Sequence, residues 1–166
     1  MQPYFILRNF SRPFKAFLFA FLFVLSVGYF TGLFFVAQTN SNQPSGIVEN
    51  YNGNENSEEI SVMKFKKGER EMLTIIHTHV LSIGFIFALL GILVWGTQIP
   101  TKWKTFLTIE PFFSVIVTFG GIYLIWLEYT LMAYFVMFSG ILMTLSFVAG
   151  VVVVCIDLIK SPIETL

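Results

Sequence analysis

Long runs of apolar residues, separated by short polar segments, dominate the pattern along the chain. The four runs cover residues 16–37, 72–96, 105–127 and 131–156. Each run exceeds the ~20 residues that a helix needs, at ~1.5 Å rise per residue, to cross the ~30 Å hydrocarbon core of a bilayer. Glu110, near one end of the third run, is the only Asp, Glu, Lys or Arg within them. The pattern therefore predicts four transmembrane helices.

The first run resembles a secretory signal in one respect, because the basic residues Arg8, Arg12 and Lys15 precede it. It is too long for the apolar core of a signal peptide, and residues 35–37 lack the small-x-small pattern of a cleavage site. We interpret this run as a membrane anchor.

The connections between the runs differ in length. The second and third runs are joined by "TQIPTKWK", and the third and fourth by little more than "EYT". Connections this short make neighbouring helices antiparallel. The sequence thus predicts an all-α membrane protein: a four-transmembrane-helix antiparallel bundle, formed as a single membrane domain over residues 1–166.

One long extracytoplasmic loop, residues 38–71, joins the first two runs. A loop of this length in a small protein is usually either functional or disordered. Its first half, "QTNSNQPSGIVENYNGNENSEE", indicates a polar coil. Its second half, "ISVMKFKKGEREM", alternates apolar and charged residues, so we expect it to be ordered from Ile60 onward and packed over the outer end of the bundle.

Composition supports a lipid environment. Of the 166 residues, 55% are hydrophobic and 12% are charged, which is about half the usual charge density of a soluble domain. The formal net charge is zero, so nothing argues for a nucleic-acid partner. The lone Cys155 excludes a disulfide within the chain.

The distribution of basic residues indicates the orientation of the bundle. Four spans place both termini on one side, which carries six Lys and Arg residues. The basic residues of the loop between the first two runs are outnumbered by six glutamates. The positive-inside rule therefore predicts cytoplasmic termini. The residues counted are Arg8, Arg12, Lys15, Lys102, Lys104 and Lys160 on the terminal side, and Lys64, Lys66, Lys67 and Arg70 in the loop.

The chain has two histidines, His77 and His79, both near the start of the second run. On a helix they diverge by about 200°, so shared ligation of one metal ion is disfavoured. They lie roughly 8–10 Å below the outer end of the span, where an ionisable side chain is a functional candidate by default. The alternative is a structural histidine that hydrogen-bonds a neighbouring helix.

The two histidines face different surroundings. The His77 face continues through Gly84, Ala88 and Gly91, a groove suited to a close helix or a flat ring. The face of His79 indicates ordinary packing or lipid contact. His77 is therefore the preferred ligand.

Other polar residues gather at the same end of the bundle. Glu128 is the single acid between the last two runs, and it is either a ligand or second-sphere partner of His77 or an interfacial carboxylate. Met132 lies just inside the fourth run. Glu110 is expected at the opposite end, beside Lys102 or Lys104.

Several of these residues resemble those of a family of short bacterial four-span membrane proteins. The matching pieces are Gly46-Ile47 with Tyr51-x-Gly53, Met63-Lys64-Phe65-x-Lys67, and Thr74 with His77-x-His79, followed by "FVMFSGILMTLSF" in the fourth run. The resemblance implies a multi-pass protein of the bacterial inner membrane with the same layout. It implies no particular chemistry.

The first functional hypothesis is a haem b or metal protein, in a respiratory or electron-transfer assembly. Four-helix bundles commonly hold cofactors between facing helices, and His is the usual axial ligand. His77, His79 and Met132 are the candidate cofactor ligands, with Met137 or water as other second ligands. His77 and Glu128 are the candidate metal ligands. Because both histidines lie on one helix, a bis-His site needs two protomers.

Two hypotheses compete with cofactor binding. The protein is a non-catalytic structural or accessory subunit that docks other membrane-protein subunits, or a second copy of itself, through its loop and its small-residue faces. Gly28-x-x-x-Gly32 is one such face. Transport is the third hypothesis, but it calls for polar groups across the membrane or helices broken at mid-depth, and Gly120-Gly121 is the one such irregularity that the sequence suggests. No catalytic residue is expected.

Overall fold

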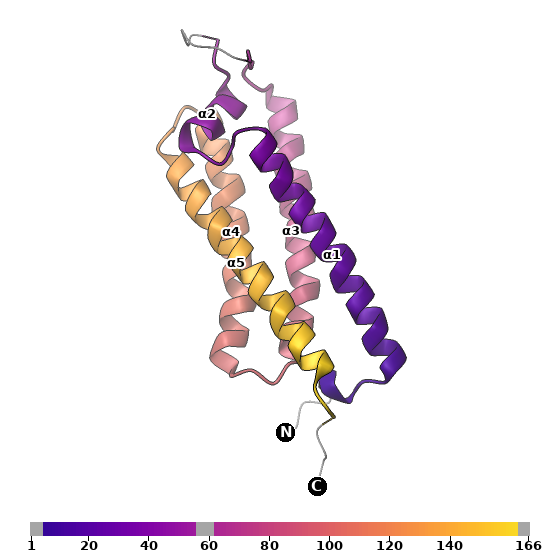
Figure 1. Ribbon diagram of the computed structural model, residues 1–166. Coiled ribbons are helices and arrows are strands. Elements are labelled where there is room, and N and C mark those ends of the chain that lie inside the picture. Colours follow the sequence, from indigo (N-terminus) through magenta and orange to yellow (C-terminus); the bar gives the residue numbers. More distant parts are fainter. Residues whose placement is uncertain (1–4, 56–61, 163–166) are drawn as a thin grey trace.

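The computed structural model describes residues 5–55 and 62–162, and every regular element in these ranges is a helix (Figure 1). The elements are η1 (Leu7–Asn9), α1 (Arg12–Gln38), α2 (Pro44–Asn52), α3 (Glu69–Trp95), α4 (Thr101–Trp126) and α5 (Met132–Ile159).

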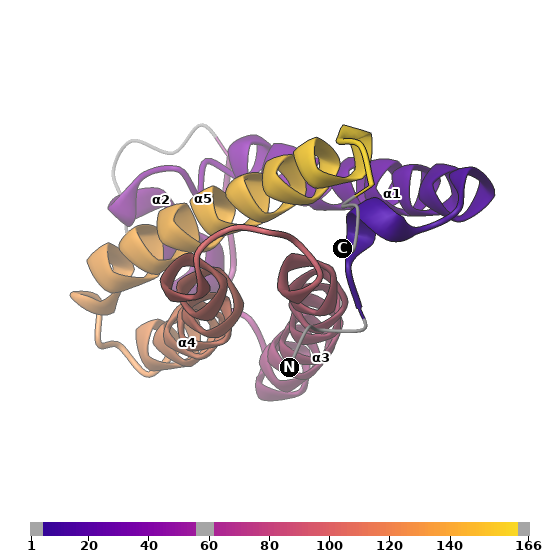
Figure 2. The same ribbon diagram turned by 90° about the horizontal axis from the view of Figure 1, so that it is seen from below.

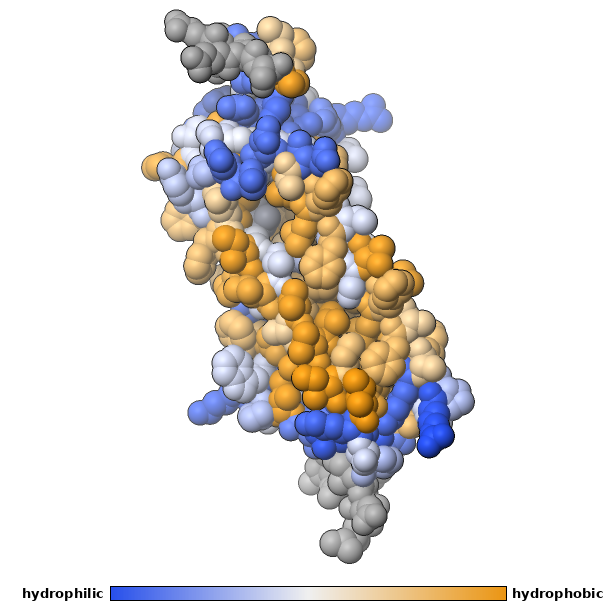
Figure 3. All heavy atoms as spheres, viewed as in Figure 1, coloured by the Kyte–Doolittle hydropathy of each residue, from blue (hydrophilic) through white to orange (hydrophobic). Residues whose placement is uncertain are grey.

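Four helices, α1, α3, α4 and α5, are long and apolar enough to cross a bilayer. On the face seen in Figure 3, apolar residues cover the middle of the molecule, and hydrophilic residues gather at both ends. The predicted all-α architecture with four spans is therefore confirmed. We call the end of the bundle that carries α2 the α2 end. We call the opposite end, where η1 packs against the C-terminal part of α5, the terminal end.

Helices α1, α3 and α4 begin earlier than the apolar runs suggest. Proline in the first turn of α1 presets the backbone for a helix that already begins at Arg12. Helix α3 begins at Glu69, with Glu69 and Glu71 in its first turn, where a negative charge is favoured by the helix dipole. The length of an apolar run does not include a polar first turn, so it places the start of the helix too late.

The four long helices are unequally packed. Helix α4 packs against α5 along much of its length and also against α3, whereas α1 makes few contacts and reaches mainly α5. Seen along the bundle, α1 extends outward from the group formed by the other three (Figure 2). Only Leu18, Leu22 and Tyr29 of α1 are buried. The Tyr29 ring stacks on that of Phe147 in α5, with ring centroids 4.0 Å apart.

The first half of the long loop is not a polar coil throughout, because residues 44–52 form the short helix α2. Pro44 lies in its first turn, and Gly53, with φ of 81°, ends it in a conformation that favours glycine. Ile47 is buried. A Cβ atom on Gly46 would lie 1.9 Å from the carbonyl oxygen of Asn40, so only glycine fits there. A helix this short with one large buried side chain has little apolar periodicity to detect.

The second half of the loop forms no regular element between residues 62 and 68, and backbone hydrogen bonds join it to α2 and the residues that follow α2. Asn54 N donates to Lys64 O at 3.0 Å, and Lys67 N donates to Tyr51 O at 3.0 Å. The apolar side chains behave differently from the expectation, because Val62, Met63 and Phe65 are more than half exposed. The backbone and the lysine side chains, rather than these apolar side chains, make the contacts with the bundle. Ile60 lies outside the described residues.

Candidate functional site

The two histidines lie in the first half of α3 and differ in their surroundings. His79 Nδ1 is 2.7 Å from the carbonyl oxygen of Ile75, and its ring centroid is 5.2 Å from that of Phe119 in α4. His77 is exposed and lines a shallow surface depression of about 600 Å³ together with residues of its own helix, including Glu69 and Thr74. Both histidines are exposed, but the His79 ring contacts Phe119 of a neighbouring helix, whereas His77 lies among residues of its own helix.

The face of α3 that continues from His77 through Gly84 and Gly91 is open at Gly84 and packed at Gly91. Gly84 is open, with no atom within 4 Å of a Cβ placed there, whereas a Cβ on Gly91 would meet Thr108 of α4 at 3.4 Å. The deeper part of this face packs against a neighbouring helix of the same chain. The part nearer His77 has no such neighbour.

Glu128 and Met132, the other predicted ligands, have partners of their own. Glu128 forms an ion pair with Lys66 and accepts a hydrogen bond from Asn52 Nδ2 at 3.3 Å. Met132 is half-buried in the first turn of α5, where it packs against the core. Within residues 5–55 and 62–162, no group of three or more His, Cys, Asp or Glu side chains could hold a metal ion. The contacts described for Glu128 and Met132 are thus with residues other than His77.

A network of hydrogen bonds fastens the loop to the α2 end. Asn52 Nδ2 donates to Ile125 O at 2.7 Å, and Trp126 Nε1 donates to Lys67 O at 2.8 Å. The ammonium of Lys66 lies 5.7 Å from the centroid of the Trp126 ring, within range of a cation–π interaction. Burial raises the pKa of the Tyr51 phenol, so it stays neutral around pH 7. These contacts give Glu128 and Lys66 a structural role.

Sequence reasoning placed Glu110 beside Lys102 or Lys104, and this placement is wrong. Lys104 Nζ donates instead to Trp95 O at 3.0 Å. The Glu110 carboxylate turns into the bundle and accepts hydrogen bonds from the hydroxyl groups of Ser114, one turn along α4, and Ser146 of α5. A carboxylate that bridges two spanning helices was therefore missed.

The carboxylate of Glu110 lies deep in the membrane domain. Ser114 is the fourteenth of the 26 residues of α4, and Ser146 is the fifteenth of the 28 residues of α5, counted from Thr101 and Met132. Both hydroxyl partners thus lie at the middle of their helices. A carboxylate at such a depth is costly, which is the usual reason to regard it as a functional candidate.

More hydroxyl groups continue this polar row towards the α2 end. Thr118 follows Glu110 and Ser114 at four-residue spacing, so the three side chains share one face of α4. The hydroxyl groups of Thr118 and Ser139 are 2.7 Å apart. The four-residue spacing of Glu110, Ser114 and Thr118 is visible in the sequence. It indicates a polar row only when the Glu110 side chain is known to lie inside the bundle.

A groove between α4 and α5, with a volume of about 450 Å³, runs along this row. Glu110, Ser114 and Ser139 contribute to its lining, and the aromatic rings of Phe106, Phe113 and Phe138 are among its walls. These three rings are exposed on the lipid-facing surface. The groove therefore connects the polar row with the hydrocarbon region.

Helix α4 has a second irregularity at this depth besides Gly120-Gly121. Pro111 follows Glu110 directly and is buried inside the helix. Proline has no N–H, so it cannot donate to the carbonyl group one turn earlier. The prediction that Gly120-Gly121 is the one mid-membrane irregularity is thus wrong.

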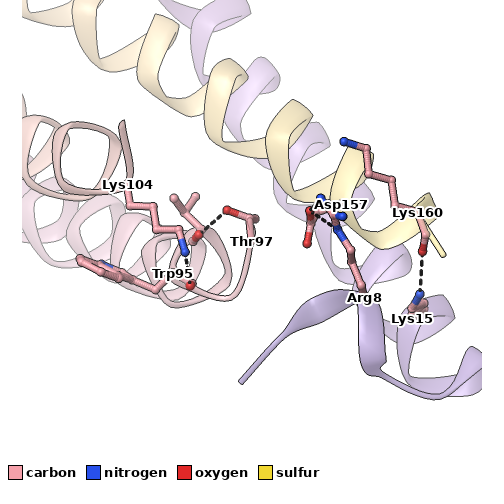
Figure 4. Close-up of polar contacts among 8 residues, drawn as sticks. Arg8, Lys15, Trp95, Thr97, Lys104, Asp157 and Lys160 are labelled. Atoms are coloured by element: carbon pink, nitrogen blue, oxygen red, sulfur yellow. Dashed lines mark hydrogen bonds and ion pairs between the residues drawn. The ribbon is translucent and has the colours of Figure 1, made fainter. Parts of the chain in front are cut away.

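A buried ion pair joins the N-terminal segment to α5 at the terminal end (Figure 4). Arg8 Nε and one of its terminal nitrogens each lie 2.8 Å from Oδ1 of Asp157. Asp157 is buried, and its second oxygen has no hydrogen-bond partner among the described residues. Leu7 N donates to Gly96 O at 3.0 Å, which ties the same segment to the end of α3.

Four antiparallel helices with an apolar belt and polar ends define a multi-pass integral membrane protein. Residues 41–165 match the family of a transmembrane helical domain, and the chain belongs to this family. The matched region covers α2 to α5 and begins after α1. No curated protein and no solved structure matches the chain.

Proposed function

We propose that the protein is a non-catalytic structural subunit of a membrane assembly, built by packing α1 against α1 of a second copy. The contact face contains Gly28 and Gly32. The observation that carries this proposal is that a Cβ on either glycine would meet no neighbouring atom of the described residues within 4 Å, so the described part of the chain leaves this close-packing face open. Small residues four positions apart let two helices approach closely in a bilayer, and no other packing role for these two glycines exists among the described residues.

The peripheral position of α1 supports the proposal. The helix is attached to its own bundle through few side chains, and the two glycines lie about 80° around its axis from the buried face centred on Leu22 and Tyr29. A second helix can therefore reach them without displacing the bundle. Glycine inside a helix costs roughly 1 kcal/mol relative to alanine, and close packing between chains would offset this cost.

Disulfide crosslinking in native membranes tests the contact. In a Cys155→Ser background, Gly28→Cys should give a crosslinked homodimer on oxidation, because the two faces meet closely. Ala20→Cys, also exposed on α1 but pointing to another side of the helix, is the matched control and should remain monomeric. A product of unequal mass at Gly28→Cys would indicate a different subunit as the partner. Monomer alone for both variants would refute packing through this face.

A second candidate function is cofactor binding at His77. Its ring is exposed in the depression on α3, so a haem or a transition metal could reach one imidazole nitrogen. Because His77 and His79 lie on one helix and diverge around its axis, a bis-His site would take His77 from each of two copies. Met132 and Glu128 would take part only if they leave their present contacts.

Optical spectra of the purified protein, oxidised and then reduced, test the second candidate. His77→Ala should abolish the spectrum of a bound haem, and His79→Ala should preserve it. Equal losses in the two variants would contradict the assignment to His77. Absence of any cofactor from the native protein would leave the structural subunit as the function.

We also propose that this subunit lies in the bacterial inner membrane with both termini in the cytoplasm. The excess of Lys and Arg on the terminal side supports this orientation. The family resemblance supports the bacterial inner membrane. Reporter fusions after Asn54 and at the Glu128 turn should report an extracytoplasmic location. Cytoplasmic signals at both positions would invert the topology.

A further inference from the structure

The most unusual side chain of the membrane domain is Glu110, for which the proposed assembly through α1 has no use. Its carboxylate lies near mid-depth and has hydroxyl groups as its hydrogen-bonding partners, from Ser114 and Ser146. No Lys, Arg or His among the described residues forms an ion pair with it. An ionised carboxylate without a cation is poorly stabilised in a hydrocarbon environment.

The titratable groups of the surrounding helices do not supply a counter-charge. Tyr29 of α1 is not cationic, and its hydroxyl group lies 3.2 Å from that of Thr144. Helix α3 carries no titratable residue between His79 and its end at Trp95. On α5, Asp157 is paired with Arg8 at the terminal end, and Cys155 lies near it. On α4, Lys104 binds the carbonyl group of Trp95.

We propose that Glu110 is a proton-binding site inside the membrane domain, which exchanges its proton along the row of hydroxyl groups that continues to Thr118 and Ser139. The proton forms one O–H bond to a carboxylate oxygen and comes from a hydronium ion or a water molecule, leaving water or hydroxide. Serine hydroxyl groups suit both states, because each can donate to the carboxylate and can rotate to accept from the carboxylic acid. The same two partners therefore satisfy Glu110 before and after protonation.

The groove gives this site access from the lipid phase. Its walls are largely apolar, with exposed aromatic rings at Phe106, Phe113 and Phe138, so lipophilic molecules can enter it more readily than ions. Because hydroxyl groups at Thr118 and Ser139 continue the polar row towards the α2 end, they provide the next positions at which a proton could be relayed. This site is independent of the helix packing proposed for α1.

Labelling with dicyclohexylcarbodiimide tests the proposal, since this lipophilic reagent reacts with protonated carboxyl groups in apolar surroundings. The full chain in lipid vesicles should form an adduct at Glu110, located by mass spectrometry of its peptides. A proton-binding site should give less adduct at pH 9 than at pH 5, because the reagent reacts with the carboxylic acid and not with the carboxylate. Glu110→Gln should abolish it, and Glu128→Gln, which changes an exposed carboxylate at the α2 end, should preserve it.

Two outcomes would overturn the proposal. Protection of Glu110 by sodium chloride, relative to choline chloride at the same pH and ionic strength, would identify a metal-cation site instead of a proton site. No adduct at Glu110 between pH 5 and pH 9, in vesicles where the reagent labels an added control protein with a known intramembrane carboxylic acid, would mean that Glu110 only joins α4 to α5. Circular dichroism of Glu110→Gln confirms that loss of the adduct does not reflect unfolding.

Discussion

Helices α1 and α4 have nearly the same length but opposite relations to the rest of the molecule. Helix α1 has the higher mean hydropathy, 2.2 against 1.6 for α4, yet only 11% of its most apolar window is buried, against 44% for α4. In a soluble protein, the more apolar helix would be expected inside. Here lipid replaces water, so apolar side chains gain little from leaving the surface, and the less apolar helix occupies the centre.

The comparison shows what holds a helix in this bundle. Helix α4 is fixed by shape and by polar contacts, since a Cβ on Gly121 would lie 2.6 Å from Val136 and the hydroxyl groups of Thr118 and Ser139 meet across the interface. Helix α1 is fixed mainly through Tyr29, and by the attachments of the segments before and after it. The family match covers α2 to α5 and leaves out α1, so it separates α1 from the other helices as the packing does.

The largest effect should come from removing the side chain that holds α1 at mid-length. Phe147 is 1% exposed, and its ring contacts those of Tyr29 in α1 and Phe87 in α3. Phe147→Ala should lower the free energy of unfolding by about 3–5 kcal/mol, because the cavity removes packing contacts that lipid cannot replace. Denaturant titration of the purified protein measures the loss.

Phe138→Ala is the matched control, because Phe138 lies on the same helix and is 69% exposed. We expect a change within ~0.5 kcal/mol. Similar losses for the two variants would show that hydrophobic area, and not packing, determines stability, and the contrast between α1 and α4 would lose its explanation.

The next effect concerns the terminal end, where the segment before α1 is joined to α5. Arg8→Ala should destabilise the protein by about 3 kcal/mol, because it leaves the buried Asp157 carboxylate without its partner. The double variant Arg8→Ala/Asp157→Ala should recover most of this loss. If the double variant is no more stable than Arg8→Ala, the loss comes from the missing arginine stem and not from an unpaired charge.

A smaller loss of stability is expected at the α2 end, in the segment that follows α1. Gly46→Ala places a Cβ 1.9 Å from the backbone oxygen of Asn40, so α2 must shift, at a cost of roughly 1–3 kcal/mol. Hydrogen exchange of residues 44–55 should accelerate. Gly120→Ala, where a Cβ meets nothing within 4 Å, should leave both stability and exchange unchanged. Equal effects would mean that α2 does not depend on this close approach.

Much of the fold could be predicted from the sequence, because spanning length is a local property. The four runs predicted α1, α3, α4 and α5, and the short connections predicted their antiparallel order. Helix α2 could not be predicted in this way, since its docking depends on the contact of Gly46 with Asn40, six residues earlier. The first turns of α1 and α3 are polar, so hydropathy placed their starts too late.

The candidate site was harder to predict, because side-chain partners depend on the rotation of each helix. The sequence singles out His77 and His79, but the contact of His79 with Phe119 depends on how α3 faces α4. Glu110 was visible as the only charged residue inside an apolar run. Its partner Ser146 is 36 residues away, and no local pattern indicates that pairing.

The smallest predicted effect concerns the turn between α4 and α5, where Glu128 is either a ligand or a structural carboxylate. Its φ is 74°, a left-handed conformation that costs a residue with a side chain about 1–2 kcal/mol and glycine much less. Its ion pair with Lys66 is exposed and contributes roughly 0–1 kcal/mol. Glu128→Gly should therefore be neutral or stabilise the protein by up to ~1 kcal/mol, whereas Glu128→Gln, which keeps the strain and loses the ion pair, should destabilise it slightly.

Thermal unfolding of the two variants, measured side by side, checks the order of their stabilities. A clear loss for Glu128→Gly would show that the carboxylate contributes more than one exposed ion pair, and would restore Glu128 as a candidate ligand beside His77.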